Sequence, residues 1–271
     1  MQVTQSELGF LRSLRTKKGR QREQKFVLEG WRALKDALNS PAKLAFVAVL
    51  DRYRHDPDYA GFFKECERRR VPIKAIGERD LGRVSDTIHS QGVLAVVASS
   101  SITLQEVTRK ARIIVAADAV GDPGNIGSII RSADWFAADA VVLGKDSVEL
   151  HNEKVVRSTV GSLFHVPVAE GVDLPSAMSQ WKASGFRVSV LSADGDEHLE
   201  EAEFEDKEVI VVGNEAHGVS KDVRREGSRL LSIRRHGQAE SLNSGVACAI
   251  ALFRLRSQVI SGKPARREQT L

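Results

Sequence analysis

A glycine-rich turn between two short apolar runs constrains the fold of this chain more than any other segment. The apolar runs cover residues 113–117 and 140–143. Residues 122–134 between them read Asp-Pro-Gly-Asn-Ile-Gly-Ser-Ile-Ile-Arg-Ser-Ala-Asp, so proline and glycine break the chain and isoleucines then recur at helical spacing. This order predicts a strand, a turn, a helix and a second strand. Such a unit is typical of an α/β layer.

Two polar residues of this turn and helix indicate a binding site. Asn125 is expected to cap the helix with its side-chain oxygen. Arg131 lies off the apolar face and close to a helix N-terminus, whose free N–H groups favour anions. Both features fit a phosphate or substrate site. The alternative is a tight corner without a ligand, because neither Gly-x-Gly-x-x-Gly nor Gly-Lys-Ser/Thr is present.

The composition is that of a globular protein with one large or two modest domains. The chain has 271 residues, of which 42% are hydrophobic and 28% charged. No apolar run approaches the roughly 20 residues that span a bilayer, and the N-terminus lacks a signal segment. We therefore expect a cytoplasmic protein. Cys66 and Cys248 are expected to be buried free thiols, and no metal site is expected because no His/Cys cluster has ligand spacing.

Charge is distributed unevenly, although the net charge is only +4. Residues 12–25 contain seven lysines and arginines and a single acid, whereas residues 194–208 contain nine acids and one lysine. This asymmetry predicts one surface that meets a polyanion such as nucleic acid. Ordinary solvated charge runs remain the alternative.

The N-terminal third is predicted to be a mobile arm followed by a small α/β domain. Residues 1–25 form the arm, in which Leu8, Leu11 and Leu14 allow a short helix. Residues 26–99 form the domain, with the boundary to the next domain between 99 and 110. Its predicted helices are 31–38, 58–70 and 81–84, and its strands are 44–50, 71–76 and 93–98.

A second domain is predicted over residues 110–260, with residues 261–271 as a loose tail. Further strands are expected at 164–168, 186–191, 209–212 and 230–233, and further helices at 151–161, 174–184 and 242–256. Gly185 stands where a helix C-cap is expected. In the last helix, we expect Val246, Ala249, Ile250 and Phe253 to face the core.

Two more glycine-containing turns follow two of these strands. Residues 213–220 read Gly-Asn-Glu-Ala-His-Gly-Val-Ser, and residues 237–245 read Gly-Gln-Ala-Glu-Ser-Leu-Asn-Ser-Gly. Ligands of open parallel sheets bind at the carboxyl ends of the strands, so the three turns should converge on one pocket. Gly213 is expected to admit a ligand close to the backbone, Glu215 to accept hydrogen bonds, and Ser241 or Asn243 to cap the last helix.

In this order, the three motifs strongly resemble those of the SpoU-type (TrmH-like) RNA ribose 2′-O-methyltransferases of the SPOUT class, over residues 111–257. Residues 154–161 also resemble a family element. The basic arm and residues 26–30 look like the family's small RNA-binding domain, which is similar to a ribosomal-protein fold. The resemblance implies S-adenosylmethionine (AdoMet) as methyl donor, a C-terminal parallel-sheet domain with a trefoil knot, an RNA substrate and a homodimer.

The resemblance also assigns roles to residues. The implied catalytic residues are Asn125, Arg131, Glu215, Ser241 and Asn243. The implied cofactor-binding residues are Leu191, Val212, Gly213, Asn214, Gly218, Ile233 and Leu242. The implied RNA-binding residues are Arg15, Lys17, Lys18, Arg20, Arg22 and Arg157.

The chemistry is an attack of the ribose 2′-hydroxyl on an activated methyl group, which the enzyme mainly aligns. A guanidinium keeps its proton up to about pH 12, so we expect Arg131 to hold the adjacent phosphate. Proton removal through water or through Arg131 stays open. His217 is an alternative titrating group, and a solvated loop histidine is the competing interpretation.

The chain departs from the family pattern at three places. Arg234 and Arg235 stand where many members have Pro-Met, Ser244 and Gly245 where Val-Ser is common, and no proline precedes Lys154. These departures affect the expected substrate geometry and leave the reaction class unchanged.

Three functions compete at this point. The leading hypothesis is methylation of ribosomal RNA, and a tRNA substrate is the nearest alternative. A non-catalytic RNA-binding or ribosome-assembly factor of the same fold is the second class. A dinucleotide-binding oxidoreductase is disfavoured, because no acidic residue follows a Gly-x-Gly-x-x-Gly motif about 20 positions later.

Overall fold

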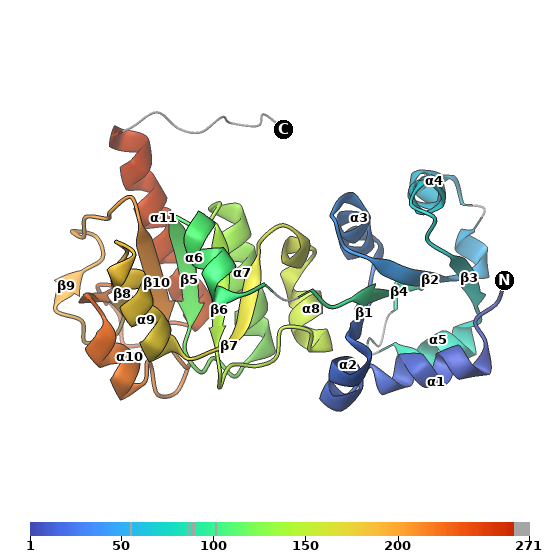
Figure 1. Cartoon of the computed structure of the whole chain (residues 1–271), viewed down its shortest axis with the longest axis horizontal. Coiled ribbons are helices and arrows are strands. Elements are labelled where there is room, and N and C mark those ends of the chain that lie inside the picture. Colours follow the sequence, from blue (N-terminus) through green and yellow to red (C-terminus); the bar gives the residue numbers. More distant parts are fainter. Residues whose placement is uncertain (55, 86, 88–89, 101, 263–271) are drawn as a thin grey trace. The chain divides into compact units, whose positions relative to one another are not determined.

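The computed structural model describes residues 1–54, 56–85, 87, 90–100 and 102–262, which form two compact units (Figure 1). Unit 1 contains residues 1–100 and 149–165, and unit 2 contains the described residues of 101–148 and 166–271. The predicted second domain includes residues 149–165. They belong to unit 1 because Val156, Leu163 and Phe164 pack into its core. Residues 263–271, nearly all of the expected tail, lie outside the described residues.

Unit 1 is built on a four-stranded sheet. Its strands are β1 (Lys25–Glu29), β2 (Leu44–Leu50), β3 (Ile73–Ile76) and β4 (Val93–Ala98), in the order β1-β4-β2-β3. Alternate side chains enter opposite cores, as the period of two in a strand requires. Phe26 and Leu28 pack toward α3 (Trp31–Asn39) and α4 (Ala60–Arg68), whereas Val27 packs toward α1 (Gln5–Ser13) and α5 (Glu78–Val84).

The predicted mobile arm is wrong for the described chain. Residues 5–13 form α1 and residues 17–23 form α2 (Lys17–Glu23). Thr4 and Glu7 make a reciprocal capping box at the start of α1. Leu8, Leu11 and Leu14 are at most 1% exposed, because their spacing places all three against the sheet. The first 25 residues are therefore part of the folded unit.

Unit 2 is built on a seven-stranded sheet in the order β7-β6-β5-β10-β8-β11-β9, and its paired strands run parallel. The strands are β5 (Ile113–Ala117), β6 (Ala140–Gly144), β7 (Val168–Val172), β8 (Arg187–Leu191), β9 (Glu197–His198), β10 (Glu208–Val212) and β11 (Arg229–Ser232). The predicted strand 164–168 is displaced. The 3₁₀ helix η3 (Ser162–Phe164) comes first, and the strand begins after Pro167, which has no N–H for a ladder.

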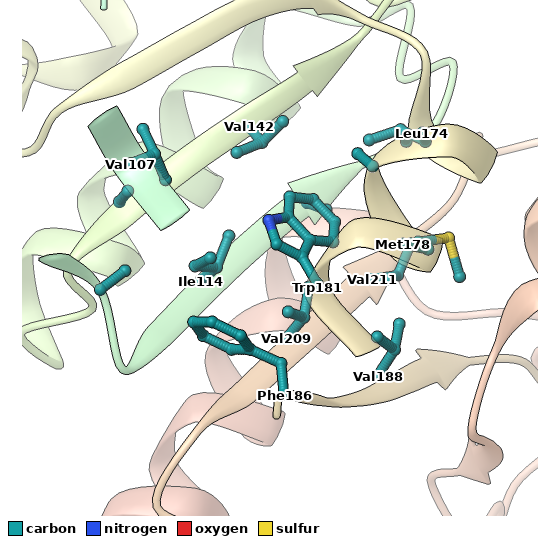
Figure 2. Close-up of a cluster of buried hydrophobic side chains, with 14 of the residues drawn as sticks. Val107, Ile114, Val142, Leu174, Met178, Trp181, Phe186, Val188, Val209 and Val211 are labelled. Carbon is teal, nitrogen blue, oxygen red and sulfur yellow. The ribbon is translucent and has the colours of Figure 1, made fainter. Parts of the chain in front are cut away.

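Helices complete both units. Unit 2 contains α6 (Leu104–Lys110), α7 (Pro123–Trp135), α9 (Leu174–Ala183), α10 (Lys221–Glu226) and α11 (Ser244–Gly262), and α8 (Glu153–Thr159) lies in unit 1. Figure 2 shows Trp181 of α9 among side chains of the sheet such as Ile114 and Val209. Trp181 is fully buried, and its indole N–H donates to Thr108 Oγ1 at 3.0 Å. Gly185 follows α9 with φ +82°, as predicted for a C-cap.

The predicted inward face of the last helix is wrong. Val246, Ile250 and Phe253 are 47%, 36% and 61% exposed. Among the described side chains of α11, the buried apolar ones are instead Cys248, Ala251, Leu252 and Leu255. The error arises because α11 is apolar on more than one side, so periodicity alone does not identify the face that packs on α7.

Two expectations from composition can be compared with the described chain. Cys66 and Cys248 are both buried free thiols, as predicted. Within the described part of the chain, no helix is long and apolar enough to cross a bilayer.

Candidate active site

The three sequence motifs lie at one edge of the unit 2 sheet. The turn into α7 follows β5, residues 213–220 follow β10, and residues 233–243 follow β11. These strands run parallel, and β5 and β8 both neighbour β10. Their carboxyl ends therefore share an edge, which is where open parallel sheets bind ligands.

Asp122, and not the predicted Asn125, caps α7. Asp122 Oδ1 accepts the Asn125 backbone N–H at 2.8 Å, and Pro123 occupies the first turn, where a missing N–H costs nothing. The Asn125 side chain is consequently available for other partners. It is only 7% exposed, so it must be hydrogen-bonded within the protein.

The Asn125 amide joins the three motifs. Its Nδ2 donates to Glu215 Oε1, and its Oδ1 accepts from Asn243 Nδ2 at 2.6 Å. Asn243 Oδ1 in turn accepts the N–H groups of Gly245 and Val246 at 2.9 and 3.2 Å, so Asn243 caps α11 as expected. Side chains separated by up to 118 positions thus form one network, in which every amide orientation is fixed by a partner.

The loop after β10 is closed and attached to the loop after β5. Asn214 and Gly218 exchange two backbone hydrogen bonds of 2.9 Å. Asn214 Nδ2 donates to Ala119 O at 2.8 Å, and Asp118 Oδ2 accepts the Ser220 N–H at 2.7 Å. These contacts hold Glu215 in a defined place beside Asn125.

The loop after β10 requires glycine at position 213. A Cβ at this position would lie 2.3 Å from the carbonyl carbon of Gly218. The glycine therefore allows the loop to close on its own backbone, and the role predicted for it, close approach of a ligand, is not needed to explain the residue type.

Other predicted site residues lie outside this network. Arg131 is exposed on α7, and Ser241 is exposed before α11; neither side chain has a hydrogen-bond partner among the described residues. Leu191 and Val212 end β8 and β10, and Ile233 follows β11. Leu242 is 47% exposed beside Asn243.

Sequence reasoning gave no role to two residues that belong to the network. Ser244 Oγ donates to Glu215 Oε1 at 3.3 Å, and Gly245 lies where α11 approaches α7. The sequence offered one signal for Gly245. A glycine in the first turn of a helix, where the backbone is not left-handed, indicates that another element packs closely against it.

The predicted RNA-binding residues differ in exposure. Arg20 is only 4% exposed and pairs with Glu149 at 2.7 Å, so the structure contradicts its predicted contact with RNA. Lys17 and Lys18 are exposed at the start of α2. Arg15 lies 3.8 Å from Glu153, Arg22 pairs with Glu23 at 2.8 Å, and Arg157 is half-buried.

A cavity of about 640 Å³ lies at the amino ends of the unit 2 strands, lined among others by Arg112, Phe186 and Ser228. His217 is exposed. Across the residues that the structure describes, no three His, Cys, Asp or Glu side chains are grouped as metal ligands.

Comparisons with known proteins identify relatives of both parts of the chain. Residues 112–253 match the SpoU rRNA Methylase family, and residues 6–95 match the MRM3-like substrate binding domain. The chain is 33% identical over 245 residues to the 23S rRNA (guanosine(2553)-2'-O)-methyltransferase RlmP of Bacillus subtilis, covering 90% of this chain and 94% of RlmP. Seven further curated relatives are longer, and the match spans 47% to 63% of their length.

Solved structures show the same similarity. The SpoU methyltransferase AviRb of Streptomyces viridochromogenes, in complex with AdoMet, superposes with a TM-score of 0.85 at 26% identity, covering 96% of this chain and all of AviRb. An AdoMet-bound rRNA methyltransferase of Sinorhizobium meliloti gives 0.84 at 25% identity, with 96% and 97% of the two chains covered. Since the family match covers more than half of the sequence, this chain belongs to the SpoU rRNA Methylase family.

Proposed function

We propose that this chain transfers the methyl group of AdoMet to the ribose 2′-hydroxyl of a nucleotide in ribosomal RNA. As a member of its family, the chain is an AdoMet-dependent RNA 2′-O-ribose methyltransferase. The observation that carries the proposal is the network of Asn125, Glu215 and Asn243, which joins the three motifs at the carboxyl edge of the sheet.

The residues at this edge fit AdoMet. Leu191 and Val212 end neighbouring strands, and residues 233–243 form neither helix nor strand, so their backbone groups are not used in the sheet ladder. Leu242 offers exposed apolar surface for an adenine ring. AdoMet, when bound, supplies a methyl group that its positive sulfur has already activated.

Arg131 acts on the RNA side of the reaction. Its side chain is exposed on α7, two turns beyond Asn125, and has no ion pair among the described residues. A guanidinium binds a phosphate with two parallel hydrogen bonds, which places the neighbouring 2′-hydroxyl in line with the methyl group. The hydroxyl proton passes to water.

Unit 1 presents the RNA to this site. Residues 1–100 contain 19 lysines and arginines and 12 aspartates and glutamates, so this unit carries the positive charge of the chain. The same residues include the match to the MRM3-like substrate binding domain. Ribosomal RNA is favoured over tRNA because RlmP, which matches almost the whole chain, is named as a 23S rRNA enzyme. We place this reaction in the cytoplasm.

Transfer of labelled methyl groups tests the proposal. Purified protein, with AdoMet carrying a tritiated methyl group, is offered unmodified rRNA and, separately, tRNA. The variants are Asn125→Ala, Arg131→Ala and, as control, Arg225→Ala, whose side chain is 72% exposed on α10. We expect label in rRNA as alkali-resistant dinucleotides, a loss of about 100-fold in the two site variants, and no change in the control.

The other outcomes contradict specific parts of the proposal. Label in tRNA alone would support the proposed reaction and contradict the proposed rRNA substrate. No transfer to either RNA, with AdoMet binding intact by calorimetry, would leave a non-catalytic RNA-binding factor. Full activity of Arg131→Ala would show that this arginine is not needed for methyl transfer.

We also propose a homodimer, supported by the exposed apolar stripe of α11. This stripe comprises Val246, Ile250 and Phe253, and Trp135 at the end of α7 is 84% exposed. Large apolar patches on a protein surface mark interfaces. A second copy of the chain would cover the stripe.

The trefoil knot implied by the family resemblance remains part of the proposal. Two observations support it. Strand β10 lies between β5 and β8, which both precede it in the chain. A Cβ on Gly195, in the loop after β8, would lie 2.7 Å from the backbone of Leu231, so this loop packs directly on β11.

A further inference from the structure

Ser244 is a buried hydroxyl at the candidate active site. It is the first residue of α11 and is only 6% exposed. Its Oγ donates to Glu215 Oε1 at 3.3 Å, and the same carboxylate oxygen accepts from Asn125 Nδ2. Two donors from two different helices therefore converge on one oxygen of Glu215.

Helix capping does not account for this hydroxyl. Asn243 Oδ1 already accepts the N–H groups of Gly245 and Val246, which are the donors that a cap satisfies. The Ser244 hydroxyl is directed to the loop after β10 instead. Its contact is thus with the site and not with its own helix.

Gly245 sets the distance between the two helices that carry these donors. A Cβ at Gly245 would lie 2.7 Å from Cβ of Ser128 on α7, closer than real Cβ contacts. Because α11 reaches α7 this closely, Asn243 Nδ2 comes within 2.6 Å of Asn125 Oδ1. A side chain at position 245 would separate the helices at the point where the network crosses between them.

We infer that Ser244 and Gly245 are positioning residues, which hold the Glu215 carboxylate and the Asn125 amide in their reactive arrangement before RNA binds. The inference rests on the proposed function, because it assigns roles inside that site. With two donors on Oε1, the carboxylate cannot rotate about its last bond without losing a hydrogen bond. Its second oxygen is then held in one direction as well.

The test compares Ser244→Ala with Ser244→Thr. We measure kcat and KM with methyl-accepting rRNA, the Kd of AdoMet by calorimetry, and the thermal unfolding midpoint. The alanine variant removes one long hydrogen bond, so kcat should fall about three- to tenfold. KM, Kd and the unfolding midpoint should stay near the wild-type values. The threonine variant keeps the hydroxyl and should retain most of the activity.

A second pair of variants tests Gly245. Gly245→Ala should lower kcat by at least tenfold, because the added methyl group meets Ser128. Adding Ser128→Gly removes the atom that the methyl group would meet and should restore part of that loss. Rescue of this kind reports the distance between the helices and not a general loss of stability.

Three results would overturn the inference. One is a kcat of Ser244→Ala within 1.5-fold of wild type, and another is an equal loss in the alanine and threonine variants. The third is a Gly245→Ala variant as active as wild type. Failure of the proposed function would look different, since wild-type protein would then bind AdoMet and transfer no label to any RNA.

Discussion

Burial decides which basic side chains near the N-terminus can bind RNA. The guanidinium of Arg20 donates to the carbonyls of Leu14 and Arg15 at 3.0 Å each and pairs with Glu149. It therefore ties α2 to the segment before α8. Lys18, two positions earlier, is exposed. Arg20 therefore stabilises the fold, whereas Lys18 is accessible to RNA.

We predict opposite effects for substitutions of these two residues. Arg20→Ala leaves Glu149 without its partner and should lower the free energy of unfolding by about 2–4 kcal/mol. Lys18→Ala should change it by less than about 0.5 kcal/mol and weaken RNA binding at low salt. Urea unfolding and filter binding measure the two quantities. A stable Arg20→Ala variant with weakened RNA binding would contradict the structural role.

His151 makes the stability of unit 1 dependent on pH. Burial lowers the pKa of its imidazole from 6.5 to about 4, and its ring lies 4.5 Å from that of Phe26. The unfolded chain takes up the proton near pH 6.5, whereas the folded chain resists it down to about pH 4. The stabilisation is therefore complete above pH 6.5 and is lost as the pH falls toward 4.

The prediction is a loss of about 1.4 kcal/mol per pH unit within this window. Hydrogen-exchange protection of peptides from β1, corrected for the intrinsic exchange rate, should decrease between pH 7.0 and 5.0. His151→Phe should flatten this dependence, because it has no proton to take up. His217→Phe, at an exposed position, should leave it unchanged. An unchanged slope in His151→Phe would show that other groups cause the dependence.

At the scale of elements, the sequence predicted most strands and helices, but it missed α2, α6 and α10 and misjudged α1 and the exposed face of α11. The strands 44–50, 93–98 and 113–117 are found as predicted, since continuous apolar runs bounded by turn residues leave few alternatives. The segment of α1 was predicted to be mobile because most of its residues are polar. Three leucines sufficed to bury one face of that helix.

Because α1 is buried, substitutions on its inner face should lower the stability of unit 1, whereas substitutions in a mobile arm would not. Leu11 is fully buried, so Leu11→Ala should lower the free energy of unfolding of unit 1 by about 2–5 kcal/mol. Gln5→Ala, on the exposed side of the same helix, is the control. Both are measured by urea unfolding. A mobile arm would show no effect for either variant.

At the scale of the whole molecule, charge and exposed apolar surface are divided between the units. Unit 1 carries the excess of basic residues, and unit 2 carries the acidic segment and the stripe on α11. Three acids of this segment form ion pairs with arginines outside it. The pairs are Glu205 with Arg187, Asp194 with Arg224, and Glu197 with Arg229. These acids therefore serve the fold of unit 2.

The proposed homodimer predicts the effect of a charge on the stripe. Phe253→Glu places a carboxylate at a position that is 61% exposed, so the monomer should stay folded and dissociate from its copy. Ala183→Glu adds the same charge to an exposed position of α9. Light scattering after size exclusion should give a monomer for the first variant and a dimer for the second. A wild-type monomer at micromolar concentration would refute the homodimer.

The sequence by itself determined most of the strands and helices, the three motifs and the family. Apolar periodicity, turn residues and motif spacing are local properties, and each can be read without knowing what lies opposite. Asn125, Glu215 and Asn243 could be named as site residues for this reason. Their meeting could be expected because parallel strands place their carboxyl ends together.

Only the tertiary structure decided which faces are buried and which partners side chains choose. In the structure, Asp122 caps α7, the side chains of Val246 and Phe253 are exposed, and Arg20 is buried. The structure also placed Ser244 on Glu215. Burial and hydrogen bonding depend on residues far away in the chain, so a segment read alone cannot show which of its possible contacts is made.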